Sequence, residues 1–417
     1  MRLPYNRPWL IELSDHPACP PSIREGVQKM LTFMWLNRII PFQAQAPYVL
    51  AADVLERVIN EIEAEDEQQD QRERNRQVDR AGDQVEGKTI KPTYADVVAN
   101  GDGNGEEDQT KSKRKAAREQ LKIVDFCSGA GGPVKKIERK INKSRRSKSL
   151  DPTQFVLSDL NPPLEQWKKL HGRAGALGSS ISYIPHSVDA TNTTSLQPTG
   201  ENAGILSGRH LRTFFLSFHH FNEELARGVL VDAMRNSEGI CIFELQQCNI
   251  RSMIMIAMLG PLTWLLTPLT WPSLSILFFT YFIPLIPAFL IIDGWISVYR
   301  TRPISHILRL TNLASLTIQL ENQDFRNNHD RNRLNHHDNK AASTRETGRE
   351  VIAEDHGGGE EEAEEDEEGY EWKWEFGKVR HTWPWGHMTY VVGRKRRLGD
   401  DDEEDDGYED GQTEYGE

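Results

Sequence analysis

The stretch Leu121-Lys-Ile-Val-Asp-Phe-Cys-Ser-Gly-Ala-Gly-Gly-Pro133 decides the fold class of this chain of 417 residues. Its first half is a short apolar run that ends in an acid, and its second half is a loop rich in glycine. Glycine lets the backbone turn tightly and approach a ligand without a Cβ in the way. The stretch therefore predicts a buried strand followed by a ligand-binding turn.

Four more apolar runs of the strand type follow along the chain. They are Phe155–Asp159, Ile181–Ile184, Thr213–Phe218 and Gly239–Glu244. A helical pattern at Asn222–Asn236 separates the last two runs. Such alternation of short strands and helices predicts an α/β fold with a Rossmann-like parallel sheet, in which ligands bind at the carboxyl ends of the strands.

Acidic residues follow three of these runs. Asp159 is suited to accept hydrogen bonds from both hydroxyls of a ribose, and Asp189, followed by Ala190, could contact an adenine amino group. Together with Asp125 they predict a nucleoside-binding rim at one edge of the sheet. The loop lacks the GxGxxG form that is typical of dinucleotide-binding folds.

The pattern Asp125-x-Cys127-x-Gly129-x-Gly131 resembles motif I of the class I S-adenosylmethionine-dependent methyltransferases, with Cys127 in place of the first glycine. The resemblance covers roughly residues 120–250, and Asp159 and Asp189 fall where that family's ribose- and adenine-contacting acids fall. It implies a class I methyltransferase sheet, S-adenosyl-L-methionine as cofactor and methyl transfer as activity. The cofactor-binding residues that it implies are Asp125, Cys127, Ser128, Gly129, Gly131, Asp159, Leu160, Asp189, Ala190 and Ser217.

One feature departs from that pattern. Asp125 and Asp159 are 34 positions apart, whereas a Rossmann-like unit has about 20. The excess lies at 135–149, which predicts an extended first helix or an insertion after it.

Other segments are similar to a group of largely uncharacterised methyltransferase-like proteins of bacteria and fungi. These segments are Arg7–Trp9, Arg212–Phe221, Phe278–Pro287 and Asp293–Ser297. This second resemblance supports the same fold and names no substrate.

His219 and His220 come at the end of the fourth run, beside the expected position of a methyl acceptor. The pKa of histidine lies near neutral, so either side chain could take a proton from an acceptor hydroxyl. The alternative is that one histidine packs against the loop and the other merely lines the pocket. Glu244, at the end of the fifth run, could orient a substrate.

Residues 252–292 contain no charged side chain, which makes 41 positions in succession. That is long enough for two minimal membrane crossings, but five prolines argue against one smooth helix. We expect contact with membrane lipid, through either a two-helix hairpin or a shallow, proline-bent wedge. An apolar lid and a dimer face are the alternatives.

Strand-like patterns at 370–376 and 388–392 predict a hairpin that closes the same sheet. Both flanks of the apolar run must then lie on one side of a membrane. Basic residues on both sides, Arg251, Arg300 and Arg302, fit two cytosolic ends.

The net charge of −13 lies in two acidic runs. Glu354–Glu368 holds ten acids and Asp400–Glu417 holds eleven, neither with Lys or Arg, so the remainder of the chain has a net charge of +8. Such runs are typical of solvated, disordered segments. A basic cluster at 135–148 could contact anionic lipid heads or form a solvated loop; nucleic acid is the weakest option, since no aromatic residues accompany it.

These patterns divide the chain into eight parts. They are a helical lead-in (1–61), a disordered insertion (62–118), a Rossmann-like core (119–251), the apolar insertion (252–292), a helical return to the core (293–321), a disordered acidic insertion (322–368), a closing β-hairpin (369–398) and a disordered acidic tail (399–417). Four cysteines without CxxC or zinc-ligand spacing predict neither a disulfide framework nor a metal site. The N-terminal residues lack the apolar run of a signal peptide, so we expect a reducing environment, with the catalytic domain facing the cytosol.

The sequence thus favours a membrane-associated, S-adenosylmethionine-dependent methyltransferase with a small or lipophilic acceptor. Two alternatives stay open: a non-catalytic membrane scaffold that keeps the fold, and an RNA methyltransferase. Against the latter, no Pro-Cys dipeptide supplies a cytosine-attacking thiol and no Asn-Pro-Pro-Tyr follows the fourth run. No pattern indicates an oligomeric state.

Overall fold

Seven strands form a single sheet in the computed structural model, which describes residues 10–86, 119–175, 179–194, 203–271, 273–346 and 370–397. The strands are β1 (Lys122–Asp125), β2 (Phe155–Leu157), β3 (Ile181–Tyr183), β4 (His210–Phe215), β5 (Gly239–Glu244), β6 (Tyr370–Thr382) and β7 (Gly386–Arg397). Their order is β3-β2-β1-β4-β5-β7-β6. Strands β1 to β5 run parallel, and β7 is antiparallel to both β5 and β6. The predicted mixed α/β class is therefore confirmed.

The strand order reverses at β1, which lies between β2 and β4. In register, Asp125 stands opposite Leu157 on β2 and Thr213 on β4. Ligands of open α/β sheets bind in the crevice at such a switch point, outside the carboxyl ends of the strands. The glycine-rich loop after Asp125 leaves the sheet at this place.

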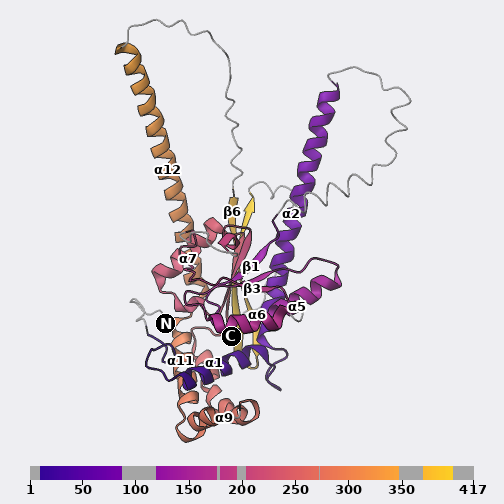
Figure 1. Cartoon of the computed structure of the whole chain (residues 1–417), viewed down its shortest axis with the longest axis vertical. Coiled ribbons are helices and arrows are strands. Elements are labelled where there is room, and N and C mark those ends of the chain that lie inside the picture. The colour runs from indigo at the N-terminus through magenta and orange to yellow at the C-terminus, as the bar shows by residue number, and fades with distance from the viewer. Residues whose placement is uncertain are drawn as a thin grey trace, which may run out of the picture.

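Helices cover both faces of the sheet, which gives three layers (Figure 1). One core cluster joins Ile123 and Phe155 to side chains of α2 (Pro47–Glu86), α5 (Val134–Ser147) and α6 (Leu164–Gly175). The other joins Val124 and Val156 to α7 (Glu223–Asn236) and α12 (Ile304–Glu346). Neighbouring residues of one strand thus enter opposite cores, as the period of two in a strand requires.

Helix α2 overturns one predicted boundary. The sequence places a disordered insertion from residue 62, but the helix continues to Glu86. Glu, Gln and Arg are strong helix formers, and acids of this stretch pair with arginines of the core. Glu63 meets Arg145 at 2.8 Å and Asp66 meets Arg209 at 2.6 Å. Polarity here reflects an ion-paired helix; residues 87–118 lie outside the described residues.

Helix α12 overturns a second boundary in the same way. The predicted helical return ends at residue 321 and is followed by a disordered acidic insertion, whereas α12 runs without interruption to Glu346. The acidic run Glu354–Glu368 and the tail after residue 397 lie outside the described residues. Figure 1 shows α2 and α12 as two rods that leave the core toward the same end of the molecule.

The basic cluster at 135–148 forms helix α5 rather than a loop. Its basic side chains face α2, where Lys140 pairs with Asp53 and Lys148 with Glu56. The Asp125–Asp159 spacing is therefore made up of the glycine-rich loop, a helix of 14 residues and a connection to β2. Because some of these basic side chains are paired with acids of α2, fewer positive charges of α5 remain to contact anionic lipid than the sequence suggests.

The charge-free run folds into short helices at the end of the molecule opposite the tips of α2 and α12 (Figure 1). They are α8 (Ile250–Ala257), α9 (Leu259–Thr270), α10 (Leu274–Leu277), the π-helical turn η3 (Phe278–Phe282) and α11 (Leu285–Arg300). By length and composition, Ile250–Thr270 could cross a membrane, and the return path through η3 and α11 bends by 73°. Pro284 stands at that bend.

Helix α1 (Pro21–Leu36) lies against this apolar insertion. Val27 and Met30 pack with Ile276 and Ile286 in a third core cluster. A Cβ on Gly26 would stand 2.5 Å from Ile286 Cδ1, so α1 and α11 approach closely. The predicted lead-in is thus helical, and its first helix belongs to the insertion as much as to the sheet.

Candidate functional site

The glycine-rich loop after β1 has a backbone that few residue types adopt. Gly129, Gly131 and Gly132 have φ of 49°, 94° and 37°, and Cys127, with φ of 55°, is the non-glycine exception in this turn. A Cβ on Gly131 would also stand 3.3 Å from Leu170 Cδ1. Positive φ disfavours residues with a Cβ, so the glycines meet a steric requirement of the turn.

Hydrogen bonds fix this loop between β1 and β2. The Ser128 amide donates to Ser158 O at 3.0 Å, and the Ser128 hydroxyl donates to Asp125 O at 2.8 Å. From α6, the buried Trp167 indole donates to Gly129 O at 2.8 Å. The loop is therefore held in shape by the protein itself.

Asp159 lies at the end of β2, half-exposed, with its carboxylate turned to the loop. Its Oδ2 accepts from the Gly129 amide at 2.9 Å and its Oδ1 from the Asn161 amide at 2.8 Å. An ionised carboxylate has about four lone-pair sites, so both oxygens keep acceptor capacity for a ligand. The neighbouring Leu160 is 54% exposed beside it.

Asp189 follows β3 in an exposed turn. It accepts from the Thr191 amide at 2.8 Å and from the Thr191 hydroxyl at 2.7 Å, while Ala190 is buried. The Val188 amide donates to Asp159 O at 2.9 Å, which ties the third loop to the second. The two predicted acids are thus brought to one place.

The three acids meet around Cys127. Burial raises the pKa of the Cys127 thiol far above its usual value, and the carboxylates of Asp159, Asp125 and Asp189 raise it further. A thiol with a raised pKa is a poor nucleophile, as expected for a small loop residue. The structure thus brings Asp125, Asp159 and Asp189 together. We call these three residues the nucleoside rim, after the role that the sequence predicts for them.

Asp125 differs from the other two acids because it is 3% exposed. Burial raises its pKa to about 7, against the lowering effect of hydrogen bonds from Ser128 and Thr213. Thr213 Oγ1 donates to Asp125 Oδ1 at 3.2 Å. Asp125 therefore stabilises the rim from within the protein and does not face solvent.

Ser217 lies just beyond β4, after Leu216, whose φ is 54°. Its side chain is 5% exposed, and among the described residues its Oγ has no hydrogen-bond partner. A buried hydroxyl without a partner is costly. This unpaired hydroxyl lies at the end of the central strand, next to the switch point of the sheet.

The two predicted catalytic histidines lie in the short 3₁₀-helix η2 (Phe218–His220) and have different surroundings. His219 is 4% exposed. Its Nδ1 is 2.8 Å from Glu244 Oε2, and its backbone amide donates to Glu244 Oε1 at 3.1 Å. Burial lowers the pKa of His219, but the carboxylates of Glu244 and Glu12 outweigh burial and raise it to about 9.

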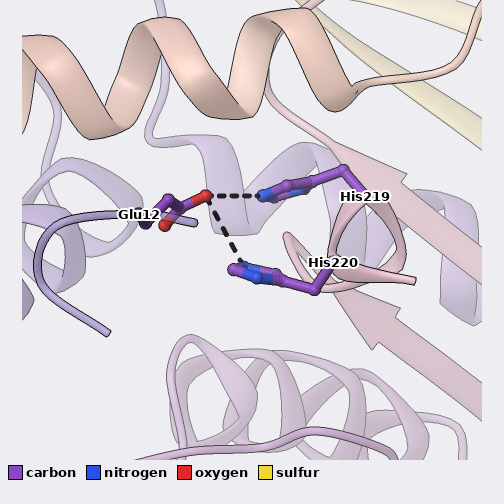
Figure 2. A group of neighbouring side chains, drawn as sticks. All are labelled: Glu12, His219 and His220. Atoms are coloured by element: carbon purple, nitrogen blue, oxygen red, sulfur yellow. Dashed lines mark ion pairs between the residues drawn. The ribbon is translucent and has the colours of Figure 1, made fainter. Parts of the chain in front are cut away.

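His220 is the accessible member of the pair, with a side chain 38% exposed. Burial of its ring and the neighbouring His219 lower its pKa to about 4. Figure 2 shows both rings turned toward the carboxylate of Glu12, which comes from the N-terminal segment. The Nε2 atoms lie 3.6 Å (His219) and 4.0 Å (His220) from Glu12 Oε1.

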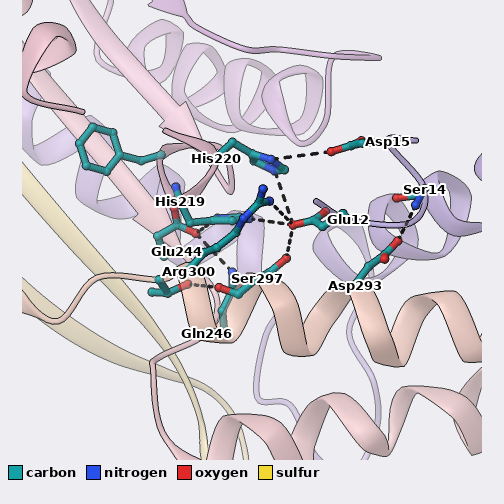
Figure 3. Close-up of polar contacts among 12 residues, drawn as sticks. Glu12, Ser14, Asp15, His219, His220, Glu244, Gln246, Asp293, Ser297 and Arg300 are labelled. Carbon is teal, nitrogen blue, oxygen red and sulfur yellow. Dashed lines mark hydrogen bonds and ion pairs between the residues drawn. The ribbon is translucent and has the colours of Figure 1, made fainter. Parts of the chain in front are cut away.

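Glu12 is a residue that the sequence did not single out. Burial raises its pKa, but His219, His220 and Ser297 outweigh burial and lower it to about 2. Helix α11 holds it: Ser297 Oγ donates to Glu12 Oε1 at 2.7 Å, and Arg300 lies 3.3 Å away (Figure 3). We call Glu12, His219, His220 and Glu244 the histidine cluster.

One faint signal could have pointed to Glu12. Asp293, Ser297 and Arg300 are spaced four and three apart at the end of the apolar run, so they share one face of a helix. Asp293 accepts from the Leu13 amide at 2.6 Å and from the Ser14 amide at 3.0 Å. This polar face needs a partner, although nothing in the sequence says which segment supplies it.

The sequence matches no protein-family profile and no curated protein. Solved structures that resemble it include LepI in complex with SAM, at 12% identity and a TM-score of 0.31, covering 66% of this chain and 43% of that one. The pyocyanin biosynthetic protein PhzM is 11% identical over 66% of this chain and 51% of its own, with a TM-score of 0.27.

A S-adenosylmethionine-dependent methyltransferase from Clostridium acetobutylicum is 8% identical over 33% of this chain and 48% of its own, with a TM-score of 0.21. This chain spans less than half of the length of LepI. Overlaps of this size do not assign a function, so the function is argued from the site.

Proposed function

We propose that the chain is an S-adenosylmethionine-dependent methyltransferase that works at a membrane surface on a small or lipophilic acceptor. The nucleoside rim is the observation that carries the first half of this proposal. The switch point of the sheet is surrounded by three acids, by a glycine-rich loop whose backbone a ligand can contact directly, and by the unpaired Ser217 hydroxyl. The motif at Asp125–Gly131 resembles that of class I methyltransferases, and a cofactor of that kind fits these groups.

Each group has a separate task in holding such a cofactor. Gly129 and Gly132 have open space where a Cβ would stand, so the backbone can meet a ligand directly. Asp159 offers carboxylate oxygens as acceptors to two ribose hydroxyls. Asp189, followed by Ala190, offers an acceptor to the adenine amino group. The sulfonium of S-adenosylmethionine supplies an electrophilic methyl group; the protein has to position the acceptor and exclude water.

Cofactor binding is testable by calorimetric titration of S-adenosylhomocysteine into the detergent-solubilised full chain. We expect micromolar affinity for the wild type. Asp159→Asn keeps an acceptor for the loop amides but loses charge, so its affinity should fall at least tenfold, and that of Asp159→Ala further. The matched control is Glu165→Ala, because Glu165 is an acid on α6 whose side chain is 80% exposed. Absence of binding by folded wild type would overturn the methyltransferase proposal.

The apolar insertion supports the membrane half of the proposal. Within Ile250–Thr270, the span of α8 and α9, only 17% of the most apolar window is buried inside the protein, whereas a core helix of a soluble protein is mostly buried. Large apolar side chains stand exposed along the insertion. The most exposed are Ile250, Leu265, Leu269, Leu274 and Phe282. Exposed apolar surface of this extent marks a protein or membrane contact.

Helix α1 favours the shallow wedge over the membrane-spanning hairpin. Its apolar face packs on Ile276 and Ile286, near the far end of the insertion. Its outer face carries the Glu25–Lys29 ion pair, which is largely exposed. A hairpin that crossed the bilayer would take these charges into hydrocarbon, at a cost of several kcal/mol. A wedge in one leaflet leaves them in water.

Flotation of the full chain with phosphatidylcholine vesicles tests lipid contact. Leu274→Glu combined with Phe282→Glu should abolish flotation, whereas Leu320→Glu, at an exposed apolar position of α12, should not. For depth, Leu274→Cys in a Cys248→Ser background can be probed with an impermeant thiol reagent trapped inside vesicles. Labelling from the inside would contradict the wedge. Failure of the wild type to float would contradict lipid contact, and flotation that survives the double substitution would contradict contact through the apolar insertion.

A further inference from the structure

The histidine cluster has the composition of a metal site that uses one carboxylate and two imidazoles. One ligand atom each from Glu12, His219 and His220 lie within 4.8 Å of one another. Donor atoms bound to a single tetrahedral Zn²⁺ at about 2.1 Å stand about 3.4 Å apart. The Nε2 atoms of His219 and His220 lie 3.6 Å and 4.0 Å from Glu12 Oε1, so those two distances are already close to that value (Figure 2).

The group behind His219 matches one that stands behind a metal ligand. A metal-bound histidine usually donates its other ring N–H to a carboxylate, which fixes its tautomer and orientation. Here His219 Nδ1 lies 2.8 Å from Glu244 Oε2, whereas His220 Nδ1 lies 3.9 Å from Asp15 Oδ2, which is an ion-pair distance and too long for a hydrogen bond. In both rings the opposite nitrogen, Nε2, is the one that faces Glu12. Figure 3 shows Glu244 beside His219 and Asp15 beside His220.

Carboxylates and cationic groups both surround the cluster. Glu12, Asp15, Glu244 and Asp293 stand near Arg24 and Arg300, and Arg302 lines the same pocket as His219 and Glu244. Arg300 Nη1 lies 3.3 Å from Glu12 Oε1. Imidazoles must be neutral to act as ligands, so a bound cation would take the place of the proton that these carboxylates favour on His219.

We propose that Glu12, His219 and His220 bind a divalent first-row transition metal such as Zn²⁺. Three protein ligands leave at least one coordination position open, which is the pattern of catalytic rather than structural zinc sites. Since His220 is partly exposed, that position is reachable from solvent. The sequence could not show this set, because Glu12 and the histidine pair lie in distant parts of the chain.

The site stands two residues beyond Ser217, on the acceptor side of the nucleoside rim. There a metal-bound hydroxyl of an acceptor would lose its proton more readily. In this arrangement the histidines act as ligands and not as proton acceptors. The metal site itself is independent of methyl transfer and can be tested without the cofactor.

Calorimetric titration of Zn²⁺ into the chelator-stripped, detergent-solubilised full chain is the test. We expect one tight equivalent for the wild type and at least a tenfold loss of affinity in Glu12→Gln and His220→Ala. His220 is partly exposed, so His220→Ala carries the test even if the buried Glu12→Gln unfolds. His16→Ala, an exposed histidine of the same N-terminal segment, is the matched control and should bind as the wild type does.

Cobalt substitution identifies the ligands independently. Co²⁺ held by imidazole and carboxylate gives visible d–d bands without the thiolate charge-transfer band that Cys248, an exposed cysteine, would produce. Equal Zn²⁺ affinity in all four proteins, no tight equivalent in the wild type, or a thiolate band would each overturn the proposal. A retained far-ultraviolet circular dichroism spectrum confirms that each variant is folded.

Discussion

The nucleoside rim and the histidine cluster both contain carboxylates and both lie at the carboxyl ends of strands, yet they are built in opposite ways. In the rim, Asp159 and Asp189 accept from backbone amides of the loops around them and stay partly open. In the cluster, Glu12 and Glu244 are buried and bonded to side chains from other segments. Local loops make a site that can receive a ligand; long-range contacts make one that also holds the fold together.

The largest expected effect separates the two regions by stability. Glu244→Ala removes the hydrogen bonds that Glu244 accepts from the His219 amide and ring. The buried imidazole of His219 then keeps only one carboxylate partner, Glu12. Breaking a buried ion pair from one side costs about 3–5 kcal/mol. We expect the free energy of unfolding in urea to fall by that amount.

The control for that measurement is Glu165→Ala, which removes an exposed carboxylate near the rim. Its effect should stay within about 0.5 kcal/mol. A small change in Glu244→Ala would show that the cluster contributes little to stability, and the contrast between the two regions would fail.

Within the rim, Asp125 is the buried exception, so its ionisation should affect the free energy of unfolding, with the opposite sign to the loss of Glu244. Its folded-state pKa of about 7 lies above the unfolded value of about 3.9. Its favourable contribution is therefore complete below about pH 4 and is lost as the pH rises toward 7. Each pKa unit corresponds to about 1.4 kcal/mol, so Asp125→Asn should be more stable than the wild type at pH 8 by up to about 4 kcal/mol.

Urea unfolding at a series of pH values checks this expectation. The gap between Asp125→Asn and the wild type should close between pH 8 and pH 4. A gap that is constant with pH would mean that Asp125 is ionised throughout this range.

A smaller effect is expected from the loop that carries the rim. Gly131→Ala introduces a Cβ at φ of 94°, 3.3 Å from Leu170 Cδ1, and should cost about 1–3 kcal/mol together with affinity for S-adenosylhomocysteine. Gly172→Ala in α6 has nothing within 4 Å and should be neutral or stabilising by up to about 1 kcal/mol. Equal thermal midpoints for the two variants would contradict a strained loop.

The smallest effect is expected at the exposed end of the rim. Asp189→Ala removes a single hydrogen-bonding group for an adenine, worth about 0.5–1.5 kcal/mol, which corresponds to a two- to twelvefold loss of S-adenosylhomocysteine affinity. Stability should hardly change, because Asp189 bonds only its own turn. A loss as large as that of Asp159→Ala would mean that the two acids act as one unit.

The same contrast explains what the sequence could predict. Each of β1, β2 and β5 is a short apolar run closed by an acid or followed by one, and that local pattern located the sheet and the rim. The helical extensions beyond residues 62 and 322 were missed because their polarity was interpreted as disorder. The ion pairs of the first extension, such as Glu63 with Arg145, join segments far apart in the chain. Glu12 was missed for the same reason.

Helix α11 connects the helices of the apolar insertion to the histidine cluster. The segment Glu12–Ser14 is held by hydrogen bonds to Asp293, Ser297 and Arg300 of α11. Leu290 of the same helix packs in the apolar cluster with α1. A displacement of α11 along its axis by a single residue, 1.5 Å, would carry Glu12 past the two imidazole rings by a similar distance. One helix thus fixes the distance between the apolar insertion and the histidine cluster, so neither can shift without the other.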